Sequence, residues 1–255
     1  MFFRRLLFKL MELGLGLRPY FGLQTKNPIF VNFRLSDAEA AAVQASLPAG
    51  FALQSIRFSS SDTEPHSWVS YNFYELGYPR PEMAAIRKIR CEVNTFVCDP
   101  EGRLGVFVFC GAPFVSREQT PSTFGRVADF AEKLVIFLYG CGRLTAVRYE
   151  LGRAIRATLD EPEASLTLDV LAEGSPDRLS DDYQRYNDIS FFNSGKSHDL
   201  VHVNSAFTLA SIMRVDPASI TGTGKTLFFD RAPDEVLLHR GEIGYLVSAL
   251  HGPTS

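Results

Sequence analysis

Short apolar segments rich in phenylalanine, tyrosine, valine and isoleucine recur along most of the chain, and turn sequences separate them. Such segments fit the half-buried surface of a pleated sheet. Helices do not alternate with these segments, so the pattern disfavours a parallel α/β sheet and predicts an antiparallel barrel or a pair of curved sheets. We expect strands at 28–34, 51–58, 67–77, 87–98, 104–110, 134–139, 143–151, 153–160, 165–171, 200–214, 225–230 and 242–250.

Few helices are expected within this mainly β chain. Ser36 or Asp37 is a suitable N-cap for a helix that ends near Leu47, before a proline and a glycine. The apolar spacing after Pro121 favours a second short helix, which leads into the strand at 134–139. The polar stretch 172–199 is typical of a long connection, such as a lid or a binding loop.

Residues 1–17 form the pattern of an amphipathic helix. Arg4, Arg5 and Lys9 interrupt its apolar residues, so the segment is a poor signal peptide and too short and charged to span a bilayer. Its apolar side suits a membrane surface, a second subunit or the chain's own domain. We expect residues 1–27 to be an N-terminal helix and arm, and 28–255 to be one domain.

The charge balance argues against a role in nucleic-acid binding. The chain has 26 basic and 29 acidic residues and a net charge of −3, so it lacks the positive field that such binding needs.

Its four cysteines show no metal-ligand spacing, which predicts no zinc site and a cytoplasmic chain with buried thiols. The segment 222–226 resembles the end of a phosphate-binding loop but lacks its first glycine, and no cofactor is expected.

Lysine is scarce, with 6 lysines beside 20 arginines, and one of them has an apolar setting. Lys133 lies within the sequence Phe-Ala-Glu-Lys-Leu-Val. A lysine that is removed from water shifts towards its neutral, nucleophilic form and can form a Schiff base with a carbonyl compound. The alternative is a surface lysine whose stem packs while its head pairs with Glu132 or Asp129.

The order of these segments resembles that of the acetoacetate decarboxylase superfamily. The similarity includes the strand and helix up to residue 47, the strand 67–77, the strand that ends at 94–97 and a distal hairpin at 222–230. The family motif is a Gly-Arg pair, a spacer and Tyr-Pro-Lys-Lys-Leu, which Gly125, Arg126, Lys133 and Leu134 match in part. The resemblance implies a closed β-barrel with an internal pocket, a homo-oligomer and decarboxylation of keto acids through a lysine Schiff base.

The resemblance also suggests roles for single residues. Lys133 corresponds to the nucleophile, Glu92 to the proton shuttle, and Arg126 or Arg90 to the clamp for a carboxylate. Glu132 replaces the second lysine of the motif, so the usual like-charge activation is missing. A second alignment places Arg143 on the lysine position, and Arg143 is therefore a substrate-binding candidate.

Two alternatives stay open beside the Schiff-base enzyme. The first is a lysine-independent lyase or isomerase in which Glu92 moves a proton while Arg90, Tyr74 or Asn72 stabilises an oxyanion. The second is a carrier of an apolar small molecule without catalysis. In each case the predicted partner is a small, largely apolar carbonyl compound or organic acid.

Overall fold

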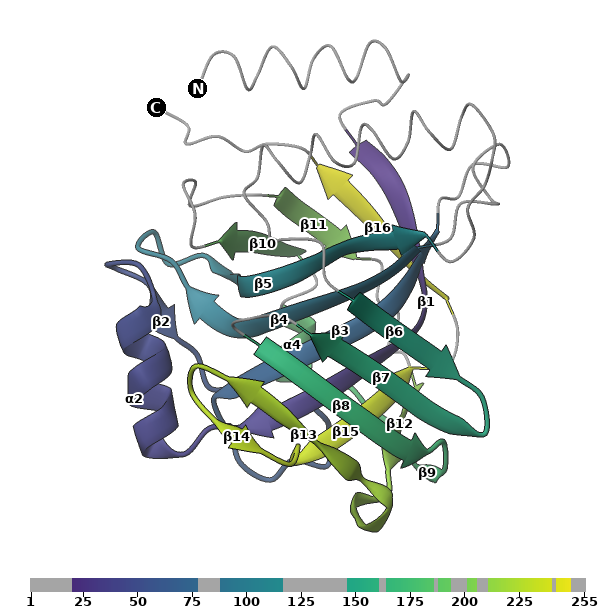
Figure 1. Cartoon of the computed structure of the whole chain (residues 1–255). Helices are drawn as coiled ribbons and strands as arrows, with labels where there is room; N and C mark the ends of the chain where they lie inside the picture. The colour runs from purple at the N-terminus through teal and green to yellow at the C-terminus, as the bar shows by residue number, and fades with distance from the viewer. Residues whose placement is uncertain are drawn as a thin grey trace.

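The computed structural model describes residues 20–77, 88–116, 146–160, 164–185, 188–193, 201–205, 211–239 and 242–248, and most of them form two β-sheets (Figure 1). The mainly β class and the small number of helices are therefore confirmed. The strands are β1 (Tyr20–Arg34), β2 (Ala52–Leu53), β3 (Trp68–Gly77), β4 (Lys88–Cys98), β5 (Leu104–Ser116), β6 (Ala146–Leu151), β7 (Ala154–Asp160), β8 (Ala164–Leu171), β9 (Gly174–Arg178), β10 (Asp188–Asn193), β11 (Val201–Ser205), β12 (Ser211–Val215), β13 (Thr221–Thr226), β14 (Asp230–Arg231), β15 (Glu235–His239) and β16 (Glu242–Ser248). The helical elements are α2 (Asp37–Ser46), α4 (Asp181–Gln184) and the 3-10 turn η3 (Pro217–Ser219).

Helix α2 begins where the sequence predicts it. The Glu39 carboxylate accepts a hydrogen bond from the Ser36 amide at 2.8 Å, and the Ser36 hydroxyl accepts one from the Glu39 amide at 3.4 Å. This capping box satisfies two backbone donors that the first turn leaves without partners. The helix ends at Ser46, just before the proline that cannot continue it.

Strand β1 organises the eleven-stranded sheet because it pairs with three other strands. Residues 20–26 pair with β16, residues 29–32 pair with β15, and the opposite edge of β1 pairs with β3. A register shift between Lys26 and Ile29, with Asn27 at φ 45°, separates the two halves of the strand. The pairings run from β1 through β3, β4, β5, β10, β11 and β16 back to β1, and all are antiparallel except that of β10 with β5. The closed barrel itself stays a prediction.

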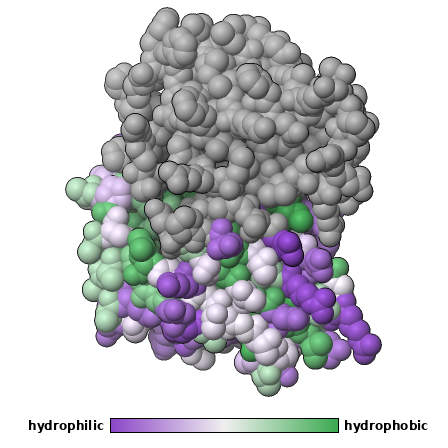
Figure 2. Space-filling model, in the orientation of Figure 1, coloured by the Kyte–Doolittle hydropathy of each residue, from purple (hydrophilic) through white to green (hydrophobic). Residues whose placement is uncertain are grey.

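The five-stranded sheet, in the order β14-β13-β8-β7-β6, packs against one face of the larger sheet. Its strands β7 and β8 alternate buried and more accessible residues, and Figure 2 shows hydrophilic and hydrophobic residues mixed over this side of the molecule. The core between the two sheets includes Ile29, Val31, Phe33, Val69, Tyr71, Phe73, Cys91, Val93, Ile155, Leu166, Leu168 and Val236.

Two glycines of the segment that resembles a phosphate-binding loop serve this packing. They lie in β13, where a Cβ on Gly224 would come within 2.3 Å of the Phe33 ring. Gly222 has φ +137°, and a Cβ there would lie 2.0 Å from the Thr167 carbonyl oxygen. The sheet therefore requires glycine at both positions for close packing, and no phosphate site is needed to account for them.

We use "far face" for the side of the eleven-stranded sheet that is turned away from the five-stranded sheet. A second apolar cluster covers part of it, and helix α4 lies over this cluster, behind β3 and β4 in the view of Figure 1. The cluster contains Phe30, Ile56, Phe58, Trp68, Phe96, Val106, Val108, Leu179, Ile212 and Leu237, with Tyr183 packed against it. Both faces of the central strands are thus buried over much of their length.

The structure differs from the sequence-based expectations in several places. One is the predicted strand 225–230, of which residues 227–229 lie in the turn between β13 and β14. The predicted loop 172–199 is wrong in part, because β9, α4 and β10 lie within it. Strand β9 has the polar sequence GSPDR, and its backbone pairs with β12, a long-range contact that no local pattern reveals. Strand β15 was not predicted, and only residues 52–53 of the predicted strand 51–58 form a strand.

Several predictions lie outside the described residues. These are the N-terminal amphipathic helix at 1–17, the helix after Pro121 and the strand at 134–139. In the part of the chain that the structure describes, no helix has the length and apolar character needed to cross a bilayer.

Candidate functional site

Four predicted site residues occupy neighbouring positions on the far face. Strands β3 and β4 pair so that Asn72 lies opposite Glu92, and Tyr74 lies opposite Arg90. Directly opposed residues of an antiparallel pair point to the same face, with Cβ atoms about 5 Å apart. The structure therefore brings Asn72, Tyr74, Arg90 and Glu92 together, and we call these four residues the β3–β4 block.

Glu92 is a buried acid within this block. Only 5% of the residue is accessible, and its Oε1 forms an ion pair with Nη2 of Arg90. A buried carboxylate is tolerated when a cation or hydrogen-bond donors compensate it. The Arg90–Glu92 pair carries no net charge, and it presents both a strong donor and a strong acceptor to the same small region.

Among the described residues, several buried polar atoms of the far face make no hydrogen bond, and Asn72 Oδ1, Thr25 Oγ1 and His239 Nδ1 are three of them. Glu235 Oε2 is another, and it forms an ion pair with Arg214. The register places Thr25 opposite Leu76, two positions beyond Tyr74, and thus on the same face as the block. His239 pairs with Ile212 of the far-face cluster. Buried polar atoms are nearly always paired in folded proteins, so these three are available to a ligand.

The environment of His239 decides its charge. The residue is 7% exposed, and burial lowers the pKa of its imidazole. The neutral ring is therefore favoured at physiological pH, with one nitrogen as a donor and the other as an acceptor. His239 thus adds a neutral polar group to the far face rather than a cation.

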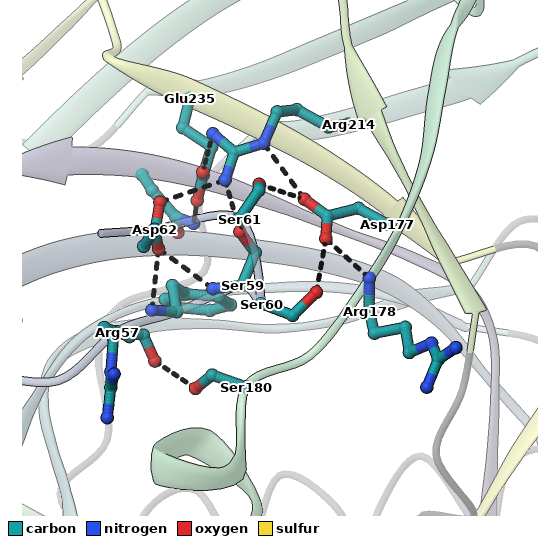
Figure 3. A network of polar contacts seen from close by, with 12 residues as sticks. Arg57, Ser59, Ser60, Ser61, Asp62, Asp177, Arg178, Ser180, Arg214 and Glu235 are labelled. Carbon is teal, nitrogen blue, oxygen red and sulfur yellow. Dashed lines mark hydrogen bonds and ion pairs between the residues drawn. The ribbon is translucent and has the colours of Figure 1, made fainter. Parts of the chain in front are cut away.

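A second polar cluster surrounds Arg214 on strand β12 (Figure 3). Its guanidinium contacts three carboxylates: Asp62 at 3.0 Å, Asp177 at 3.1 Å and Glu235 at 2.5 Å. The acidic side chains are 3%, 6% and 2% exposed, so one arginine compensates three buried acids. It also donates to the Ser59 hydroxyl. This arrangement joins the loop before β3 to β9, β12 and β15.

The acids of this cluster differ in their pKa values. Burial raises the pKa of Glu235 to about 7, although the charge of Arg214 opposes the shift. Burial also acts to raise the pKa of Asp177, but hydrogen bonds from Ser61, the Arg178 amide and Ser60 outweigh it and lower that pKa to about 2. Glu235 is therefore the acid of the cluster that exchanges a proton near neutral pH.

A hydrogen-bonded chain connects Glu235 to strand β3. Asn32 Nδ2 donates to Glu235 Oε1 at 2.7 Å, and Ser70 Oγ donates to Asn32 Oδ1 at 2.7 Å. Asn32 is fully buried and Ser70 is 1% exposed. Ser70 lies two residues before Asn72 on the same face, so the chain leads to the β3–β4 block.

Sequence reasoning missed Asn32, Arg214 and Glu235. Glu235 is followed by Val-Leu-Leu, and a charged residue at the start of such an apolar run is a signal of a buried acid. Arg214 and Asn32 carry no comparable signal, because their partners are far away in the sequence.

Three of the predicted site residues, Lys133, Arg126 and Arg143, lie outside the described residues. Within the described ranges, no group of three histidine, cysteine, aspartate or glutamate side chains could hold a metal ion. Cys91 is buried and Cys98 is partly exposed, and both are free thiols.

Comparisons with known proteins give little information about this chain. No protein-family model matches the sequence, and no curated protein matches it. A solved structure of a candidate AttH protein from Nitrosomonas europaea is similar over 92% of this chain and 53% of that one, with 8% sequence identity and a TM-score of 0.24. The chain thus spans about half the length of that protein. A similarity at this TM-score carries no argument about fold or function.

Proposed function

We propose that the chain binds a small, largely apolar organic acid or carbonyl compound at the far face and that Glu92 transfers a proton to and from it. One observation carries the proposal: Glu92 is buried and ion-paired with Arg90, directly opposite an asparagine whose Oδ1 has no partner. Buried acids with a cationic neighbour and unsatisfied polar atoms are typical of functional sites.

The arrangement of the far face supports an enclosed binding space. The strand pairings return to β1, as they would in a closed barrel whose interior is the far face. The apolar cluster around Trp68 and Phe96 lies beside the block and would contact the apolar part of a ligand. The polar part would then contact Arg90, Asn72 and Thr25.

The proposed chemistry needs no cofactor. The Glu92 carboxylate takes a proton from the carbon next to a carbonyl group, and the electron pair of that C–H bond moves towards the carbonyl oxygen. Arg90 and the side-chain amide of Asn72 stabilise the negative charge on this oxygen. If the substrate is a β,γ-unsaturated carbonyl compound, the electron pair is shared with its γ-carbon, and return of the proton from Glu92 to that carbon completes an isomerisation.

Deuterium exchange tests this proposal. The full chain is incubated in D2O with γ-oxooctanoate, and NMR follows the incorporation of deuterium next to the ketone. We expect catalysed exchange that Glu92→Gln slows by about 100-fold or more, the usual range for loss of a general base. The control is Glu101→Gln, an exposed acid in the turn after β4 that should exchange at the wild-type rate. Equal rates for wild type and Glu92→Gln would refute the role of Glu92.

The two alternatives give different results in the same system. A Schiff base at Lys133, as the resemblance to acetoacetate decarboxylases implies, would leave a covalent adduct on that residue after borohydride reduction. A carrier would bind γ-oxooctanoate without catalysing exchange. Mass spectrometry of the reduced protein and calorimetry of the wild type therefore separate the three cases.

A further inference from the structure

The hydrogen-bonded chain from Glu235 to Ser70 has a fixed direction when Glu235 is ionised. A carboxylate only accepts hydrogen bonds, so Glu235 accepts from Asn32 through Oε1, while its Oε2 forms an ion pair with Arg214. The Asn32 amide then turns its nitrogen to Glu235 and its oxygen to Ser70. The Ser70 hydroxyl has to donate to that oxygen, at 2.7 Å.

The direction of these hydrogen bonds determines whether Ser70 acts as a donor or as an acceptor towards its other neighbours. Its single hydrogen points to Asn32, so the remaining lone pairs of Ser70 Oγ can only accept. Two positions along β3 and on the same face, Asn72 Oδ1 is a second acceptor, and it is buried without a partner. Ser70 Oγ and Asn72 Oδ1 are therefore two neutral acceptors on the same face of β3, about 7 Å apart along the strand.

We infer that the ligand carries a hydroxyl group that donates a hydrogen bond to Asn72 Oδ1, with Ser70 Oγ as the neighbouring acceptor, and that Glu235 is the positioning residue that sets this preference. The inference rests on the proposed function and narrows its ligand class to acids or carbonyl compounds that also carry a hydroxyl group. A ketone oxygen in the place of this hydroxyl would face acceptors only and gain nothing from them. An ammonium group would lie close to the guanidinium of Arg90, which disfavours it.

Glu235 acts on this preference without contact to the ligand. In the variant Glu235→Gln, the new amide must still turn its oxygen to Arg214, because Arg214 only donates. Its NH2 group then faces Asn32, which has to present Oδ1 to it and Nδ2 to Ser70. Ser70 accepts from Asn32 in that case, and its hydrogen points towards the ligand. The substitution therefore exchanges donor and acceptor in each hydrogen bond from residue 235 through Asn32 to Ser70, while the heavy atoms stay in place.

The test measures the binding of two acids, octanoate and β-hydroxyoctanoate, by calorimetry at about pH 8.5. Glu235 is ionised at this pH because its pKa is about 7. For the wild type, we expect the hydroxy acid to bind about tenfold more tightly than octanoate, the effect of one additional hydrogen bond. In Asn72→Leu and Glu235→Gln this ratio should fall to about one. Asp177→Asn is the matched control, since it removes another carboxylate from Arg214 without changing Asn32, and it should keep the wild-type ratio.

The outcomes separate the inference from the function on which it rests. If octanoate and β-hydroxyoctanoate bind the wild type equally well, the hydroxyl preference is wrong while the proposed site stands. If neither acid nor γ-oxooctanoate binds, the proposed function fails, and this inference fails with it. A ratio that falls in Asp177→Asn as much as in Glu235→Gln would overturn the role of Glu235. Should Glu235→Gln not fold, Ser70→Ala removes the same acceptor and leaves the Arg214 cluster intact.

Discussion

The carboxylate of Glu235 lies 2.5 Å from the guanidinium of Arg214, and its other oxygen accepts a hydrogen bond from the Asn32 amide. This contact joins two parts of the far face that are remote in the sequence. On one side are the loop before β3 and strand β9, which Asp62 and Asp177 connect to Arg214. On the other side is the centre of β3, next to the proposed ligand site.

The raised pKa of Glu235 predicts a loss of stability as the pH increases. The folded protein retains the proton up to about pH 7, whereas a glutamate in the unfolded chain releases it near 4.5. This stabilising contribution is complete below about pH 4.5 and is lost between 4.5 and 7, with a maximum of about 3 kcal/mol. Urea unfolding at about pH 5 and pH 8 measures it. Glu235→Gln should remove this difference, and an unchanged pH slope in the variant would contradict the assignment.

Asp177 makes the opposite contribution on the acidic side. Its folded pKa of about 2 lies below the ordinary value of 3.8, so it stabilises the fold above pH 3.8 and this stabilisation disappears as the pH falls towards 2. In acid titrations followed by circular dichroism, Asp177→Asn should show a smaller loss of stability between these two values than the wild type. A variant with the full wild-type loss would show that Asp177 does not contribute.

Arg214→Leu should destabilise the protein more than any single acidic substitution in the cluster. It leaves three buried carboxylates without their cation, and removing one partner of a buried ion pair typically costs about 3–5 kcal/mol. The free energy of unfolding in urea is the measurement, with Arg156→Leu as the control because its ion pair with Asp169 is exposed. A cost below about 1 kcal/mol, typical of surface pairs, would mean that the cluster is dispensable for folding.

The packing between the two sheets predicts different effects at two glycines. Gly224→Ala would place a methyl group 2.3 Å from the Phe33 ring and should cost about 1–3 kcal/mol through overpacking. Gly152→Ala has its closest neighbouring atom at 4.0 Å and should be nearly neutral. Thermal unfolding of both variants tests the prediction, which fails if their midpoints shift equally.

Local sequence signals predicted the local parts of this fold. The capping box of Ser36 and Glu39 and most of the strands were found from the sequence, because each depends on neighbouring residues. Strand β9 was missed because its polar residues form a strand only through backbone pairing with β12.

The candidate site also combines residues that the sequence predicts with contacts that only the folded structure shows. Glu92 and Arg90 emerged from a resemblance, and the structure places them in contact. Asn32 and Glu235 are 203 residues apart, so only the folded sheet shows that they form a hydrogen bond. The donor-to-acceptor direction of this series of hydrogen bonds depends on all of its members together, so no single residue type predicts it.

The most direct measurement of the central claim compares Glu92→Gln with Lys133→Ala in the exchange of γ-oxooctanoate protons for deuterium. Proton transfer by Glu92 predicts that Lys133→Ala keeps a rate close to that of the wild type, while Glu92→Gln loses about 100-fold or more. The opposite order, with exchange lost in Lys133→Ala and retained in Glu92→Gln, would contradict the account.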